Sequence, residues 1–139
     1  MGKLIAHTKL RKVGRQVLNQ VGPHVFITDE PLSLHGTDAG PSPVQYLLST
    51  LGSCLAISAK SIAEHDPDLE LSLFNVDVVG ETTTFADKSS KLIQVTMRIT
   101  CQTNLDPDSQ AEFIDHALHI CTVHNTIKAA VPITIEILS

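Results

Sequence analysis

The middle of the chain carries a long segment, residues 46–62, that is apolar or small on nearly every side. Ser42 can cap its start, Pro43 suits the first position of a helix, and Pro67 follows its end. The pattern predicts one helix from residue 42 to about residue 64. A helix that is apolar all round must be covered on all sides. In a chain of 139 residues a second copy supplies part of that cover most easily, so we expect a homodimer.

Alternating apolar and polar positions on both sides of this helix predict strands. The expected strands are 15–21, 24–28, 69–81, 92–101 and 131–137, and two further helices are expected at 106–120 and 121–130. No repeat, linker or low-complexity segment interrupts the pattern. The order β-β-α-β-β-α-α-β predicts one α+β domain over residues 1–139 with a mainly antiparallel sheet.

Composition narrows the range of functions. Apolar residues make up 42% and charged residues 18%, which is typical of a globular protein. The net charge of −5 disfavours a nucleic-acid partner, because phosphate binding needs a basic face. The start of the chain lacks a signal-peptide pattern, and no run of about 18 apolar residues predicts a membrane span. We therefore expect a cytoplasmic protein without a membrane partner, whose three cysteines are free or catalytic.

Cys54 lies deep inside the predicted central helix. The charge effect of a helix N-terminus fades within one turn, and apolar surroundings disfavour a thiolate. A reactive Cys54 therefore needs a cation from another segment, with Arg15 as the first choice and Arg11 as the second. Without such a cation, Cys54 is an inert packing residue.

Cys121 begins a predicted short helix, where free backbone N–H groups favour a thiolate. His124 follows three residues later and is within reach of it. The alternative is again a small core residue. Cys101 lies near the end of a predicted strand without any helper, so it is expected to be structural.

Other chemistries fit less well. Zinc is usually bound by histidine and cysteine, and four such residues lie close in sequence: His116, His119, Cys121 and His124. Their spacing matches no standard pair of zinc ligands. The glycine-rich segment 36–40 lacks the Lys-Ser/Thr end of a phosphate loop, and no Gly-x-Ser-x-Gly is present. We therefore expect neither a metal nor another cofactor.

Two motifs resemble one family. The run from Gly40 to Leu48, followed by Leu51-Gly52-Ser53-Cys54, resembles the loop and central helix of the OsmC/Ohr family. Cys121-Thr122-Val123-His124 resembles the second motif of that family, which is usually Cys-Pro-Val-His. The segment from His24 to Asp38 also resembles the approach to the helix in OsmC-like members.

The resemblance implies an OsmC-like fold, in which a mainly antiparallel sheet wraps around a long buried central helix in an intertwined homodimer. It implies thiol-dependent reduction of organic hydroperoxides in peroxide or osmotic stress defence, with Cys54 as the peroxidatic and Cys121 as the resolving cysteine. An arginine from the N-terminal region would stabilise the thiolate at the dimer interface. A dithiol or a lipoylated protein would serve as the reductant.

The chain departs from the family pattern where a glutamate usually orients that arginine. Val44 and Gln45 occupy the two positions where the glutamate would fall. Gln45 can accept a hydrogen bond from a guanidinium but carries no charge. The alternative to an efficient peroxidase is therefore a low-turnover OsmC-like protein that binds small molecules or senses redox state, with an apolar pocket between the subunits.

Overall fold

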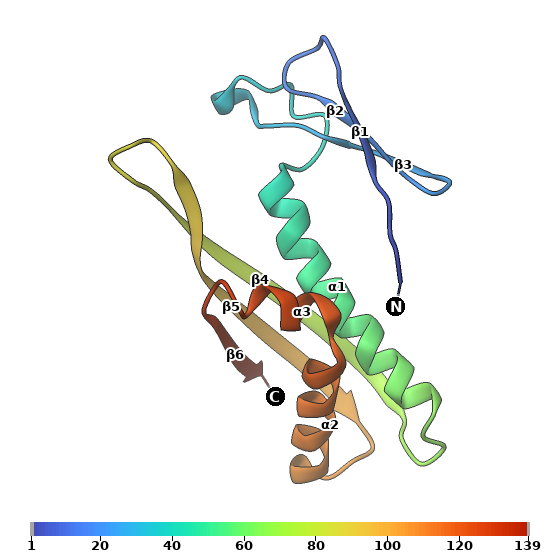
Figure 1. Ribbon diagram of the computed structural model, residues 1–139. Helices are drawn as coiled ribbons and strands as arrows, with labels where there is room; N and C mark the ends of the chain where they lie inside the picture. Colours follow the sequence, from blue (N-terminus) through green and yellow to red (C-terminus); the bar gives the residue numbers. More distant parts are fainter. Residues whose placement is uncertain (1, 139) are drawn as a thin grey trace. The chain divides into compact units, whose positions relative to one another are not determined.

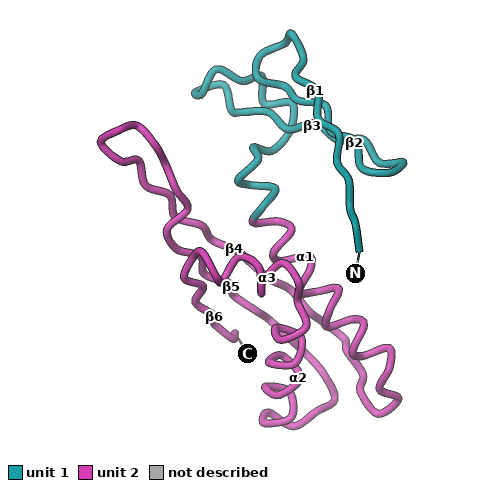
Figure 2. The backbone as a smooth tube through the Cα atoms, viewed as in Figure 1, with its two compact units in different colours: residues 1–47 teal, residues 48–139 magenta. Residues whose placement is uncertain are grey.

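The computed structural model describes residues 2–138 and divides into two compact units, with the boundary between Leu47 and Leu48 (Figure 2). The predicted single domain over residues 1–139 includes two terminal residues outside the described range. It stays a prediction, and each unit is described below by itself.

The first unit holds an antiparallel sheet of three strands (Figure 1). The strands are β1 (His7–Leu10), β2 (Val17–Val21) and β3 (His24–Thr28), and a short 3₁₀ helix, η1, follows at Leu32–Leu34. The predictions for β2 and β3 are confirmed, but β1 was not predicted. All four residues of β1 are exposed, so no alternation of buried and exposed side chains marks this strand in the sequence.

Helix α1 spans Pro43–Glu64, as predicted, and most of it belongs to the second unit. Within one chain it buries a single face, formed by Leu51, Gly52, Leu55 and Ala59. The opposite face carries Ile57, which is 68% exposed. A second copy that covers this face stays a prediction.

The second unit is built on a sheet in the order β4-β5-β6. Strands β4 (Leu71–Thr84) and β5 (Ser90–Thr103) form a long antiparallel hairpin, whereas β6 (Ile133–Leu138) pairs with β5 in parallel. A parallel pair needs a crossover connection, which α2 (Pro107–Ile120) and α3 (Thr122–Ile127) supply. Three expected strands and two expected helices are thereby confirmed, while the sheet proves to be mixed.

Helices α1 and α2 pack on the same face of this sheet. Gly52 of α1 approaches β4 so closely that an added Cβ would lie 3.1 Å from Val78 and 3.7 Å from Val76. Phe74, two residues before Val76 on the same face, meets Phe113 of α2 edge to face at 6.4 Å. The fold is therefore a two-layer α+β arrangement, with Val95, Met97, Ile99 and Cys101 of β5 at its centre.

Helix α1 is the one helix of residues 2–138 that is long and apolar enough to cross a membrane. The core helix of a soluble protein meets the same criteria, so length and composition alone are weak support for a span.

Candidate active site

Cys54 and Cys121 come together in the second unit, although 67 positions separate them in the sequence. Cys54 lies on α1, is half-buried and packs at the border of the core. Cys121 is the residue between α2 and α3 and is fully buried. The Cys54 side chain lies close enough to Cys121 to raise the pKa of the Cys121 thiol. The structure thus brings one accessible and one enclosed thiol together.

The local sequence fixes Cys121 at the junction of two helices. Its extended backbone (φ −74°, ψ 108°) ends α2 and begins α3. Asn125 holds this corner, because its backbone N–H donates to the Cys121 carbonyl at 3.0 Å and its side-chain amide donates to the His119 carbonyl at 2.8 Å. These bonds satisfy carbonyls that the end of α2 leaves open. The position of the sulfur therefore follows from the cap geometry.

Burial raises the pKa of the Cys121 thiol, and the neighbouring Cys54 raises it further. The backbone N–H groups of His124 and Val123 act in the opposite direction without reversing the shift. The Cys121 thiol therefore keeps its proton to a higher pH than an ordinary thiol.

His124 contributes to Cys121 through its backbone, as an N–H donor. Burial lowers the pKa of the His124 imidazole, and the charge of Lys128 lowers it further, against an opposing hydrogen bond to the Leu118 backbone. Its Nδ1 is buried and has no hydrogen-bond partner among the described residues. The His124 imidazole is therefore neutral near pH 7, and its link to Cys121 is the backbone N–H.

Cys101 lies apart from these two thiols. It is buried on β5 within the core, and burial raises the pKa of its thiol. It is a free thiol, as are Cys54 and Cys121. Its surroundings fit a packing residue.

Gln45 is engaged at the start of α1. Its Oε1 accepts from the Ser42 backbone N–H at 2.8 Å, and Ser42 Oγ accepts from the Gln45 N–H at 3.3 Å. This reciprocal pair is a capping box, and Val44 beside it is exposed. The predicted role of Gln45 toward an arginine stays a prediction.

The two candidate arginines lie in the first unit, on the turn between β1 and β2. Arg15 is exposed, whereas Arg11 donates from Nη1 to Gln16 Oε1 at 3.0 Å. Sequence reasoning missed Gln16 and its connection to Thr37 and the buried Asp29. The only signal was that these polar residues flank a strand and a glycine-rich loop, which does not reveal a pairing.

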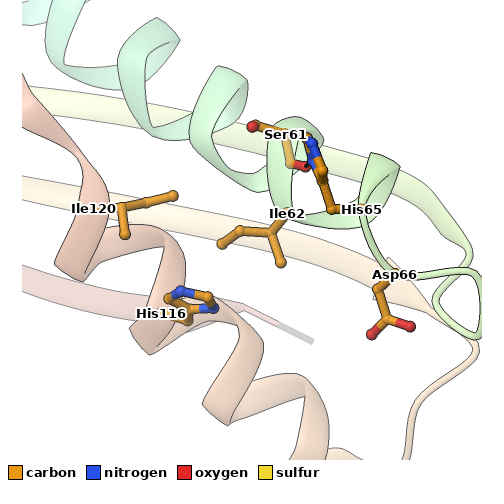
Figure 3. A pocket seen from close by; sticks show the side chains of 6 residues that line it. All are labelled: Ser61, Ile62, His65, Asp66, His116 and Ile120. Carbon is orange, nitrogen blue, oxygen red and sulfur yellow. Dashed lines mark hydrogen bonds between the residues drawn. The ribbon is translucent and has the colours of Figure 1, made fainter.

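A hollow of about 620 Å³ lies between the end of α1 and α2 (Figure 3). Its lining consists of Ser61, Ile62, His65, Asp66, His116 and Ile120. Within residues 2–138 no three His, Cys, Asp or Glu side chains are close enough to hold a metal ion. Neither Cys54 nor Cys121 lines the hollow.

Comparison with known proteins identifies the class. The OsmC-like protein family matches residues 36–136. No curated protein matches the sequence significantly. Because the match covers most of the chain, the chain belongs to the OsmC-like family.

Solved structures share its fold. An OsmC-like protein from Mycoplasma pneumoniae is 20% identical with a TM-score of 0.86, covering 99% of this chain and 96% of that one. An organic hydroperoxide resistance protein OsmC from Legionella pneumophila is 16% identical with a TM-score of 0.77, covering 100% and 98%. An organic hydroperoxide resistance protein from Elizabethkingia anophelis is 13% identical with a TM-score of 0.75, covering 99% and 96%. The α+β OsmC-like fold predicted from the sequence is confirmed.

Proposed function

We propose that this protein reduces organic hydroperoxides with Cys54 as the peroxidatic and Cys121 as the resolving cysteine. The observation that carries the proposal is that the Cys54 side chain lies near enough to Cys121, within one unit of the fold, to shift the pKa of its thiol. Relatives of the same fold that are called organic hydroperoxide resistance proteins support the choice of substrate. The apolar core against which Cys54 packs favours an alkyl or aryl peroxide over hydrogen peroxide.

The reaction balances with groups that the chain supplies. The Cys54 thiolate attacks the terminal peroxide oxygen, the O–O bond breaks, and the alkoxide takes a proton and leaves as an alcohol. Cys54 is then a sulfenic acid. The Cys121 sulfur attacks it, a disulfide forms, and the hydroxyl leaves with the Cys121 proton as water. A dithiol reduces the disulfide by exchange and is itself oxidised.

The two different environments support the division of roles. A peroxidatic sulfur must be reached by substrate, and Cys54 is the more exposed of the two. A resolving thiol does not have to react with the substrate, and Cys121 is enclosed with its pKa raised by burial.

The remaining parts of the site belong to the proposal as well. An arginine of the turn between β1 and β2, Arg15 or Arg11, stabilises the thiolate, and Gln45 takes the place of the missing glutamate. The working form is a homodimer in which a second copy covers the exposed face of α1. A dithiol or a lipoylated protein reduces it in the cytoplasm.

Peroxide consumption tests the proposal. The wild type is given cumene hydroperoxide or hydrogen peroxide, with dihydrolipoamide as the reductant. We expect faster turnover of the organic peroxide, complete loss in Cys54→Ser, and near wild-type rates in Cys101→Ser. Equal rates in wild type and Cys54→Ser would refute the proposal.

A low-turnover binding or redox-sensing role is the second candidate. The observation in its favour is the uncharged Gln45, whose oxygen is already used in the capping box. Single-turnover kinetics separate the two functions. A sensor forms the Cys54–Cys121 disulfide rapidly but is not recycled by dithiols on the time scale of turnover.

A further inference from the structure

Two hollows adjoin each other between the end of α1 and α2, and both lie within the second unit. The first has a volume of about 620 Å³ (Figure 3) and the second a volume of about 420 Å³. Ile62, Asp66 and His116 line both hollows, so the two are parts of one groove. We refer to it as the α1–α2 groove. The second hollow adds Leu69, Leu105, Ser109, Glu112 and Phe113 to its lining.

The floor of the groove is apolar and held in place by the core. Leu69 and Phe113 are buried, while Ile62 and Leu105 are partly buried and pack against the core. Phe113 also meets Phe74 of β4 edge to face at 6.4 Å. A hollow of several hundred Å³ with an apolar lining and a few polar groups is typical of a small-molecule site. The floor therefore suits the apolar body of a ligand.

The backbone sets which nitrogen of His65 carries the hydrogen. His65 Nδ1 lies 2.7 Å from the Ser61 carbonyl oxygen. A carbonyl oxygen can only accept, so Nδ1 is the donor. In a neutral imidazole the other nitrogen, Nε2, is then an acceptor. His65 therefore brings a lone pair to the groove that it lines.

Asp66 is fixed in the turn that follows α1. Its Oδ1 accepts from the Asp68 backbone N–H at 3.0 Å, and its own backbone N–H donates to the Ala63 carbonyl at 3.3 Å. Its other carboxylate oxygen, Oδ2, has no hydrogen-bond partner among residues 2–138. Glu112 adds a second carboxylate from α2. The groove thus presents acceptors from both of its walls.

The charges of the lining restrict the class of ligand. Asp66 and Glu112 are negative, and among the described residues no lysine or arginine lines either hollow. Lys60, next to Ser61 in the sequence, is paired with Glu64 at 3.9 Å. An anion would be repelled here, and the described part of the chain offers no three side chains that could hold a metal ion. An ammonium group only donates hydrogen bonds, so it matches a lining of acceptors.

We propose that the α1–α2 groove binds a small organic cation, with an ammonium group at the Asp66 and Glu112 carboxylates and an apolar body on the floor. His65 Nε2 accepts a further hydrogen bond from the ammonium group. Neither Cys54 nor Cys121 lines the groove, so this site does not depend on the peroxidase function.

Calorimetry on the full-length protein tests the choice of ligand. The probes are phenylbutylamine, phenylbutanol and phenylbutyrate, which share one apolar body and differ in the charge of the end group. The titrations are made at about pH 8, where histidine is normally neutral. We expect the amine to bind about tenfold more tightly than the alcohol, because hydrogen bonds to an ionised group are roughly twice as strong as neutral ones. The carboxylate should bind most weakly.

Two variants separate the charged wall from the apolar floor. Asp66→Asn removes the charge but keeps the oxygen that accepts from Asp68, and it should weaken the amine by about tenfold without affecting the alcohol. Asp115→Asn, which removes a charge from an exposed position of α2 outside the lining, is the matched control and should leave both affinities unchanged. Ile120→Ala should weaken the amine and the alcohol by the same factor.

NMR titration locates the bound amine independently of affinity. The backbone amide signals of Asp66, Asp68 and Ile120 should shift in the wild type. Shifts confined to other residues would overturn the proposal, and so would equal amine affinities in Asp66→Asn and Asp115→Asn, no binding of the amine, or tighter binding of phenylbutyrate. Sedimentation with saturating phenylbutylamine tests for a second copy in the groove. If the amine dissociates an assembly of the wild type, the groove is a subunit contact and the proposed site is wrong.

Discussion

The exposed face of α1 gives the sharpest test of the expected homodimer. Ile57 is 68% exposed at the centre of that face. Thr50, Ser53 and Cys54 lie one or two turns before it, and the exposed ion pair Lys60–Glu64 lies one and two turns after it. The residues from Thr50 to Ile57 are small or apolar and carry no charge, which is typical of a helix segment that packs closely on both sides. The substitution to test is Ile57→Ala.

The expected magnitude follows from the exposure. Ile57→Ala removes about three methylene-sized groups worth about 0.8 kcal/mol each when buried. About two-thirds of the Ile57 surface is free to be covered by a partner, so one copy contributes about 1.6 kcal/mol. A two-fold interface contains the residue twice, which gives about 3 kcal/mol. Each 1.4 kcal/mol is tenfold in Kd, so the dimer should be weakened by about 200-fold.

Analytical ultracentrifugation over a concentration series measures this Kd. The chain itself should stay folded, because Ile57 contributes little to the core of one chain. Val79→Ala is the matched control, since Val79 is an exposed apolar residue of β4 on the face away from the helices. The reasoning is wrong if the wild type is a folded monomer at micromolar concentration, or if Ile57→Ala and Val79→Ala have equal dimer affinities.

Three further predictions concern the cysteines and the start of α1. Stoichiometric peroxide should form a disulfide between Cys54 and Cys121, with Cα atoms about 4.4–6.8 Å apart; peptide mapping that finds Cys101 in the bridge instead would contradict the assignment. Gln45→Glu or Val44→Glu should raise peroxidase activity by adding a carboxylate near the arginine, and Gln45→Glu also keeps the capping box; if neither variant is faster in the cumene hydroperoxide assay, no clamp operates there. Burial raises the pKa of Cys121, so the unfolded state ionises first as pH rises. The contribution of Cys121 to the free energy of unfolding is complete below its pKa in the unfolded chain, near 8.5, and is lost as pH rises through the higher pKa of the folded state. In denaturant titrations between pH 7 and 10, the free energy of unfolding should therefore decline less in Cys121→Ser than in the wild type. An equal decline in both would argue against a raised pKa of Cys121.

Several parts of the fold could be predicted because their signals are local. The bounds of α1 follow from Pro43 and the apolar run after it, and the long strands of the second unit follow from strict alternation. The two cysteines stand out because each has a distinct helical context in the sequence. The family resemblance adds their pairing, which stays a prediction.

The sequence by itself therefore determined the element types, the α+β class and the candidate sulfurs, since periodicity, caps and motifs are properties of neighbouring residues. Only the tertiary structure decided the parallel pairing of β6 with β5, the exposed strand β1, and which face of α1 one chain covers. It also decided that Arg11 reaches Asp29 through Gln16 and Thr37. These features depend on contacts between side chains far apart in the chain. Such contacts are set by how the loops close and pack, which no local pattern encodes.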